Sequence, residues 1–264
     1  MATITLTVPP IDAAGPRVQV DVDDIPTGYR LTLHRIFDGV ATMVRDARDA
    51  FASGGFSVID YEVPGGVAVS YRAELFDETG ASQGFTDAAE TELSWPMHIA
   101  YISDPLDPGN IVAAEMHTNF ASVVSRPREV ALMNVGTRVI SLLGVTGRIR
   151  GVPLWCNTYT KTEADTLARV IAATNVLVRT CPPVRVPRAM YVAIPDPEEN
   201  EQTVQLGFGQ IRWELVGDEI SSPDLNIVVP VVTWQTYIDA FPTWEDFNNA
   251  YLTWNDAIRN PPEV

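Results

Sequence analysis

The sequence has few of the basic side chains that nucleic-acid binding requires. Of its 264 residues only 18 are Lys or Arg, against 34 Asp or Glu, so the formal net charge is −16. A nucleic-acid-binding surface needs clustered basic side chains that neutralise phosphates. The acidity has two interpretations: it keeps the protein soluble, or it lines a ring or tube through which DNA passes without being bound. Net charge does not place the acids, so both stay open.

Export and membrane signals are also missing. The first residues, Met1–Thr7, contain no basic region and no apolar core of signal-peptide length. No stretch approaches the roughly 18 apolar residues of a membrane span. We therefore expect a protein that is made and folded in a cytoplasm and does not insert into a membrane.

Cysteine is scarce. The chain contains only Cys156 and Cys181, and their spacing fits neither a zinc ribbon nor a CxxC redox motif. We expect two buried, reduced thiols. A disulfide requires the two Cα atoms to lie close together, which the sequence does not show.

Signatures of catalysis are absent from the sequence. The three histidines, His34, His98 and His117, form no HExxH motif. There is no GxSxG motif, phosphate-binding P-loop or dinucleotide fingerprint either. The sequence therefore predicts no catalytic residue, no cofactor and no metal site, and the protein is not expected to be an enzyme.

Residues 1–95 are predicted to form short strands separated by turns. From Val67 to Phe76, apolar side chains recur at every second position, which places one face of the strand on a core. In Tyr29–Phe37, Arg35 interrupts the apolar face. The other predicted strands are Ile4–Val8, Val18–Val22, Ser57–Val63 and Glu90–Trp95. About seven strands in such a length are typical of a small β-sandwich of immunoglobulin or fibronectin type III form.

Residues 96–232 are predicted to be a β-rich domain with one main helix. The helix is expected at Glu163–Thr174, capped by Thr160 or Thr162. Its apolar stripe consists of Ala164, Leu167, Val170 and Ile171. Predicted strands are Val130–Met133, Thr137–Leu143, Val176–Arg179, Met190–Ile194 and Thr203–Val216. Tyr101–Asn110, with two Asp-Pro pairs, is expected to be a loop, and Asp196–Glu201 a solvated hairpin tip.

Residues 233–264 contain a repeat. The dipeptide Thr-Trp recurs every ten residues, at Thr233-Trp234, Thr243-Trp244 and Thr253-Trp254. Thr at the N-cap with an acid at N3, as in the last two units, begins a short helix. A single helical turn is unstable alone, so it needs a surface, either the chain's own body or a neighbouring subunit. The candidate subunit-interface residues are Trp234, Tyr237, Trp244, Phe247 and Trp254.

Three features together resemble a known family. The first is Val58–Tyr71, with the sequence VIDYEVPGGVAVSY, followed by Asp77–Gly80. The second is the order in the middle region: an RGVPL hairpin, a TxxEA helix, a VLVR strand, two prolines and an MYVA strand. The third is the Thr-Trp repeat. In these features, which cover nearly the whole chain, the protein resembles the minor tail, or distal tail, proteins of long-tailed bacteriophages that infect actinobacteria.

The resemblance implies a mainly β (α+β) fold in which residues 96–232 form a split β-barrel like those of tail-tube and distal-tail proteins. It also implies a structural virion protein of the phage tail tip. Such a subunit forms a ring homo-oligomer, a hexamer or trimer, around the DNA channel. It joins the tail tube protein to the other proteins of the tip or baseplate, and genomic DNA passes through without specific binding.

A second function from another class stays open on the sequence. Tryptophan side chains exposed on a β domain can stack against sugars, and the candidates for this are Trp95, Trp155 and Trp213. The alternative is therefore a carbohydrate-binding module used for host adsorption. Trp213 lies in a strong strand pattern, which favours a core position for it.

Overall fold

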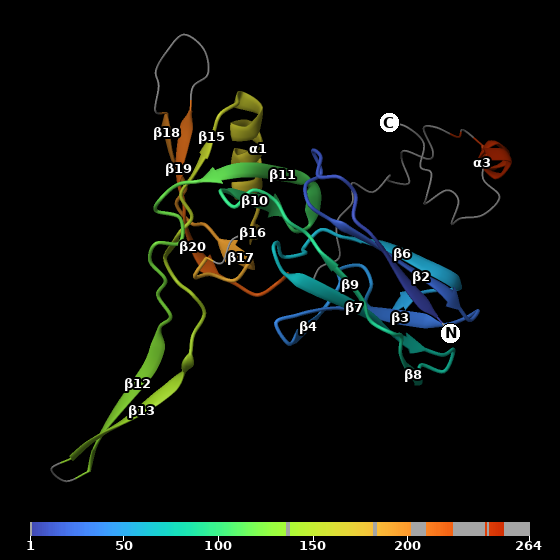
Figure 1. Ribbon diagram of the computed structural model, residues 1–264, viewed down its shortest axis with the longest axis horizontal. Helices are drawn as coiled ribbons and strands as arrows, with labels where there is room; N and C mark the ends of the chain where they lie inside the picture. Colours follow the sequence, from blue (N-terminus) through green and yellow to red (C-terminus); the bar gives the residue numbers. More distant parts are fainter. Residues whose placement is uncertain are drawn as a thin grey trace. The chain divides into compact units, whose positions relative to one another are not determined.

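The protein is mainly β, as the sequence predicts: of the residues that the structure describes, half lie in strands and 8% in helices. The computed structural model describes residues 2–135, 138–181, 184–201, 210–223, 241 and 243–250 (Figure 1). Contacts divide the chain into two compact units, residues 1–227 and 228–264. The predicted boundary after residue 95 falls inside the first unit and stays a prediction.

Two antiparallel sheets form a β-sandwich at the start of the first unit. The three-stranded sheet has the order β1-β2-β6, and the second sheet has the order β4-β3-β7-β8, with β5 on β3 and β9 on β7. The first sheet contains β1 (Thr3–Thr7), β2 (Val18–Ile25) and β6 (Gly54–Asp60). The second contains β3 (Arg30–Phe37), β4 (Val40–Met43), β5 (Ala50–Phe51), β7 (Ala68–Phe76), β8 (Ser82–Phe85) and β9 (Ala89–Glu92).

The core of the sandwich follows from the alternation of apolar side chains. In β7, Val69, Tyr71 and Ala73 are fully buried, which confirms the predicted core face. The opposing sheet contributes alternate residues of β2. In the same sheet as β7, the neighbouring strand β3 contributes Leu31 and Leu33. Successive side chains of a strand point to opposite faces, so a period of two is enough to define the buried side.

A nine-stranded antiparallel sheet, curved into a half-barrel, forms the rest of the first unit's core. Its order is β14-β20-β17-β16-β10-β11-β15-β19-β18. The strands are β10 (Ile99–Asp104), β11 (Asp107–Met116), β14 (Val152–Pro153), β15 (Cys156–Thr158), β16 (Val176–Thr180), β17 (Ala189–Ala193), β18 (Glu198–Glu201), β19 (Ile211–Glu214) and β20 (Val216–Glu219). One helix, α1 (Lys161–Ile171), packs against β10, β11 and β15. The second hydrophobic cluster lies between this helix and the sheet.

The first of the two predicted capping residues begins the helix, which therefore starts at Lys161, two residues before the predicted start at Glu163. Thr160 is the N-cap: its side chain accepts a hydrogen bond from the backbone N–H of Glu163, and Glu163 accepts one from the backbone of Thr160 in return. The helix ends at Ile171, three residues before the predicted end. The predicted apolar stripe is buried at all of its positions: Ala164, Leu167, Val170 and Ile171.

Two loop predictions are wrong. Tyr101–Asn110 is not a loop, because β10 and β11 form a hairpin in which Asp104 pairs with Asp107. The register shifts beside that pair, so Pro108 lies in an irregular stretch where a missing N–H costs no ladder hydrogen bond. The other error is the predicted tip Asp196–Glu201. Glu198–Glu201 are solvent-exposed, as expected, but they form the edge strand β18, which pairs with β19.

A long hairpin, here called the arm, consists of β12 (Arg128–Val135) and β13 (Arg138–Thr146). Both strands confirm predictions from the sequence. They pair with each other and, within the described part of the chain, with no other strand (Figure 1). Three large apolar side chains of the arm are exposed: Val130 at 55%, Met133 at 53% and Val145 at 94%.

Both cysteines are buried and free, as expected. Within the described residues, no helix has the length and apolar content to cross a membrane. In the second unit the structure describes one helix, α3 (Trp244–Ala250). Part of the predicted strand Thr203–Val216 lies outside the described residues, as do two of the three Thr-Trp dipeptides.

Candidate functional site

The sandwich and the nine-stranded sheet meet in a buried junction. Tyr101 of β10 and Cys181, just after β16, belong to the sandwich's hydrophobic cluster. The Trp95 ring packs edge-on against Tyr101, with ring centroids 5.3 Å apart. Its indole N–H donates to the carbonyl of Ile99 over 3.1 Å. The hydrophobic core of the sandwich therefore extends onto the nine-stranded sheet at this point.

The glycines of the Pro64-Gly65-Gly66 turn make the close approach possible. A Cβ at Gly65 would overlap the Trp95 ring, and Gly66 has a φ of +60°, a conformation that favours glycine. Arg188, from the segment before β17, donates to the carbonyl oxygens of both glycines. The turn is thus held by the Trp95 ring on one side and by the hydrogen bonds from Arg188 on the other.

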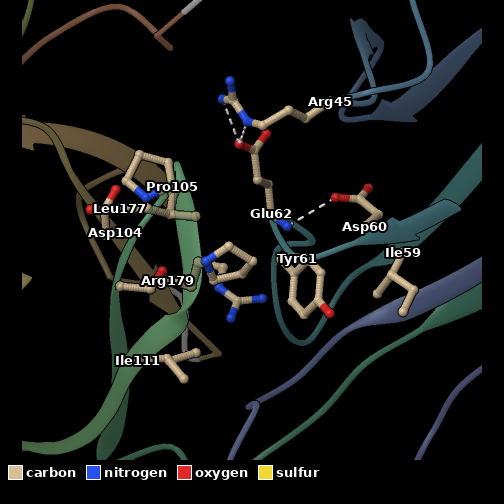
Figure 2. Close-up of a pocket in the computed structure, with 12 residues that line it drawn as sticks. Arg45, Ile59, Asp60, Tyr61, Glu62, Asp104, Pro105, Ile111, Leu177 and Arg179 are labelled. Atoms are coloured by element: carbon tan, nitrogen blue, oxygen red, sulfur yellow. Dashed lines mark hydrogen bonds and ion pairs between the residues drawn. The ribbon is translucent and has the colours of Figure 1, made fainter. Parts of the chain in front are cut away.

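A buried network of charges lies beside this turn. Asp60, the last residue of β6, accepts two hydrogen bonds from Nη1 of Arg35, at 2.7 and 2.8 Å, and one from the hydroxyl of Tyr71 at 3.0 Å. It also accepts one from the backbone N–H of Glu62. Glu62 pairs with Arg45 at 2.6 Å (Figure 2) and lies 3.8 Å from Arg35. Arg35 therefore lies on the core face of β3 together with its counter-charges.

The network fixes the protonation states of Arg35 and Tyr71. Burial alone would lower the pKa of Arg35, but the attraction of Asp60, and then of Glu62, outweighs burial and raises it. Burial, reinforced by the negative charge of Asp60, raises the pKa of Tyr71. Arg35 is thus charged and Tyr71 neutral at physiological pH. Asp60 accepts from both, so the lone pairs of its carboxylate are used in structural bonds.

A second buried arginine faces the network from the nine-stranded sheet. Arg179 of β16 is fully buried, and its Nη1 donates to the carbonyl of Pro16 over 2.7 Å and to that of Val63 over 3.5 Å. Its Nε and Nη2 have no hydrogen-bond partner among the described residues. Burial lowers the pKa of Arg179 to about 10, although Asp60 and Glu62 oppose this effect.

Between Arg179 and the Asp60–Glu62 segment lies a cavity of about 10 Å³ (Figure 2). In Figure 2 the Arg179 guanidinium points from the nine-stranded sheet toward that segment. A space of this size holds about one water molecule. This cavity therefore leaves no room for a substrate.

Arg45 extends the network to the segment that follows β20. Nη1 of Arg45 donates to the carbonyl of Pro223 over 2.7 Å, and Nη2 donates to the hydroxyl of Ser222 over 3.1 Å. An open cavity of about 520 Å³ lies here, and Arg45, Glu62 and Tyr191 are among its lining residues. Burial, and then the charge of Glu62, raise the pKa of Tyr191. Arg45 thus joins a loop of the sandwich to the segment that follows β20.

Two of the predicted interface residues, Trp244 and Phe247, lie in α3. Their rings contact each other edge-on at 5.8 Å, and Trp244 is 64% exposed whereas Phe247 is 6% exposed. Thr243 is bonded as an N-cap: its hydroxyl accepts from the backbone N–H of Asp246 over 3.2 Å. This confirms the predicted cap, but the helix has seven residues, about two turns, where a single turn is predicted. The other candidates, Trp234, Tyr237 and Trp254, lie outside the described residues.

The tryptophans predicted to stack sugars are mostly buried. Trp95 is 6% exposed, so the expectation that it lies on the surface is wrong: its ring fills the junction. Trp213 is 1% exposed, and its N–H donates to the hydroxyl of Thr158, in agreement with the core position that its strand pattern favours. Trp155 is half-buried and packs against the ring of His117 at 5.7 Å.

Sequence reasoning missed the charged residues of the junction. The interruption of an apolar face by Arg35 was the one signal, because an arginine on a core face needs a buried counter-charge. Asp60 and Glu62 fall within the segment that carries the family resemblance, but nothing local marks them as partners of Arg35. In the part of the chain that the structure describes, no group of three or more His, Cys, Asp or Glu side chains gathers to hold a metal ion.

A scan against models of known protein families gave no match for this chain, and a search of curated proteins found none that matches it.

Proposed function

We propose that the chain is a structural subunit of a bacteriophage tail tip, a distal or minor tail protein. It forms a ring around the DNA channel and joins the tail tube to the tip or baseplate. The arm is the observation that carries the proposal. Isolated two-stranded hairpins are marginally stable in water, and this hairpin exposes three large apolar side chains. Such a surface favours docking on a neighbouring subunit.

The junction supports the same function. A ring subunit has to keep two different patches in fixed relation, because each ring interface is head-to-tail. Hydrogen bonds from Arg179, Arg188 and Arg45 connect the sandwich to the nine-stranded sheet and the segment after it. This favours a rigid body over two independently moving layers.

The C-terminal unit offers a further contact surface. Trp244 has the exposure expected of an interface anchor, since tryptophan is among the side chains that dominate interface energies. The role of the Thr-Trp repeat in binding a neighbouring subunit stays a prediction. The net charge of −16 fits a channel wall that lets DNA pass without holding it.

The carbohydrate-binding alternative has less support. Of the three tryptophans considered for stacking on sugars, two are in the cores, and only Trp155 has part of its ring accessible. A glycan array on the purified protein tests this alternative, and specific binding that is lost in Trp155→Ala would favour it.

Immunogold labelling of virions of a phage that encodes this protein tests the proposed function. Label confined to the tail tip, with the protein detected in purified virions by mass spectrometry, is the expected result. Virions without the protein would overturn the proposal. Deleting residues 233–264 then tests the repeat: normal, infectious virions from the truncated protein would remove its docking role.

A further inference from the structure

The arm and the residues flanking it are basic in an acidic protein. Between residues 126 and 150 there are five arginines and one glutamate, a net charge of +4. The whole chain carries −16, so the remaining residues carry −20. Arg126 and Arg128, where β12 begins, are exposed, as are Arg148 and Arg150, after β13. None of these four forms an ion pair with a residue that the structure describes.

The apolar surface of the arm lies at the same end. Arg128 pairs with Thr146 across the hairpin, so Val130 and Val145 lie within two residues of that pair. Both valines are exposed. The base of the arm therefore presents positive charge and apolar area together. A partner for this surface must be acidic, and a strand edge would extend the arm's own two-stranded sheet.

One strand of this chain has those properties. Among the described strands, β18 is an edge of the nine-stranded sheet and pairs with β19 alone. Its four residues are all exposed, and three are glutamates: Glu198, Glu199 and Glu201. None of the three forms an ion pair within the described residues. The opposite edge, β14, is two residues long and contains Pro153, which has no N–H to donate.

The charges on β18 also select its partner. Like charges directly opposite each other destabilise a strand pair, so two β18 edges repel each other, whereas a strand flanked by arginines is attracted. The unpaired backbone groups of an edge strand supply hydrogen bonds to an added strand, and the side chains supply the specificity. Attraction of opposite charges also speeds the encounter of two copies.

We infer that the base of the arm in one copy of this chain docks on the β18 edge of the next copy. This inference rests on the proposed ring assembly and names two surfaces that form its repeating contact. The two patches differ, so the interface is head-to-tail, which closes into a ring or extends as a helical filament. Each copy uses its arm toward one neighbour and its β18 edge toward the other.

A charge-swap experiment on the full-length protein tests the inference. The arm variant is R126E/R128E, the edge variant is E198R/E199R, and a third variant carries all four changes. Sedimentation velocity measures self-association. We expect each two-residue variant to associate on the order of a hundredfold more weakly than wild type, because like charges then face each other across the contact. The four-residue variant should recover most of the lost affinity, since the charges are again complementary.

Mixing the two variants gives an independent readout. Neither associates well alone, but every arm–edge contact between an arm variant and an edge variant is complementary, so a mixture should assemble into alternating oligomers. The matched control is E90R/E92R, which reverses two exposed glutamates on β9, a strand that pairs with β7 only among the described strands. It should associate as wild type does. Circular dichroism checks that each variant is folded.

Three results would overturn the inference. The first is a wild-type protein that stays monomeric at every concentration measured. The second is weakening by the arm variant without weakening by the edge variant, which would mean that the arm contacts another surface. The third is failure of both the mixture and the four-residue variant to recover association. The tail-tip function fails separately, if labelled virions lack the protein, so the two failures are distinguishable.

Discussion

Two buried arginines on opposite sides of the junction have very different surroundings. Arg35, in the sandwich, has a carboxylate at 2.7 Å and a second at 3.8 Å. Arg179, in the nine-stranded sheet, donates to backbone carbonyl oxygens alone among the residues that the structure describes. The pKa of Arg35 is raised, whereas burial lowers that of Arg179 to about 10.

The difference between the surroundings of Arg35 and Arg179 indicates which buried charges stabilise the fold. A buried ion pair is expensive to break because the remaining partner stays buried without its counter-charge. Asp60 is bound to Arg35, Tyr71 and the backbone of Glu62 at once, so its loss affects three other residues. Arg179 already bears the cost of desolvation without a carboxylate in contact, so replacing it removes a penalty together with its bonds.

The largest expected effect is that of Asp60→Ala. This change leaves Arg35 buried without its nearest carboxylate, and we expect a loss of about 3–5 kcal/mol in the free energy of unfolding. Urea denaturation measures it, with Arg35→Met as the reciprocal variant and a loss of similar size expected. A loss below about 1 kcal/mol for Asp60→Ala, the range of an exposed ion pair, would contradict the assignment of the network as buried.

Alkaline pH tests the same network through Tyr71. Its pKa is raised in the folded protein above the value near 10 of an unfolded chain. Folded Tyr71 therefore keeps its proton where the unfolded chain loses it. The stability it contributes is complete below about pH 10 and is lost as the pH rises through the folded pKa.

Above about pH 10, the unfolding free energy should therefore fall, by up to about 1.4 kcal/mol per pH unit from this group. Urea denaturation across that range should give a shallower fall in Tyr71→Phe. The slope should not vanish, because the pKa of Tyr191 is raised as well. Equal slopes in wild type and Tyr71→Phe would show that Tyr71 does not contribute.

Replacing Arg179 by methionine should have a smaller effect than replacing Arg35. The variant loses the hydrogen bond to Pro16 but also removes a buried guanidinium of which two nitrogens have no partner among the described residues. We expect the free energy of unfolding to stay within about 1 kcal/mol of wild type. Thermal and urea denaturation of Arg35→Met and Arg179→Met in parallel measure the difference. Equal losses of unfolding free energy in the two variants would contradict the expected difference between the two arginines.

The smallest effect is expected at an exposed pair. Lys161 and Asp165 are one helical turn apart in α1, and both side chains are mostly exposed. Asp165→Ala should cost about 0.3–0.5 kcal/mol and serves as the control for Asp60→Ala. The loss should shrink in high salt, because exposed charges are screened. If Asp165→Ala lowered the free energy of unfolding as much as Asp60→Ala does, burial would not explain the difference expected between the two ion pairs.

Much of the fold could be predicted where a pattern lies within one element. The period of two in β7 and the apolar stripe of α1 each define a buried face without reference to the rest of the chain. The cap of α1 is equally local, because Thr160 and Glu163 are three residues apart. The Tyr101–Asn110 hairpin was missed because proline and aspartate favour turns, while the register shift that accommodates Pro108 depends on the paired strand.

The candidate site could not be predicted in the same way. Arg35 and Asp60 are separated by 25 residues, and Arg179 and Pro16 by 163. The sequence by itself determined the mainly β class, the buried faces and the helix cap, because these depend on spacing along a few residues of chain. Only the tertiary structure decided which charges are buried and which have a counter-charge, because desolvation and pairing depend on what the folded chain brings within a few ångströms.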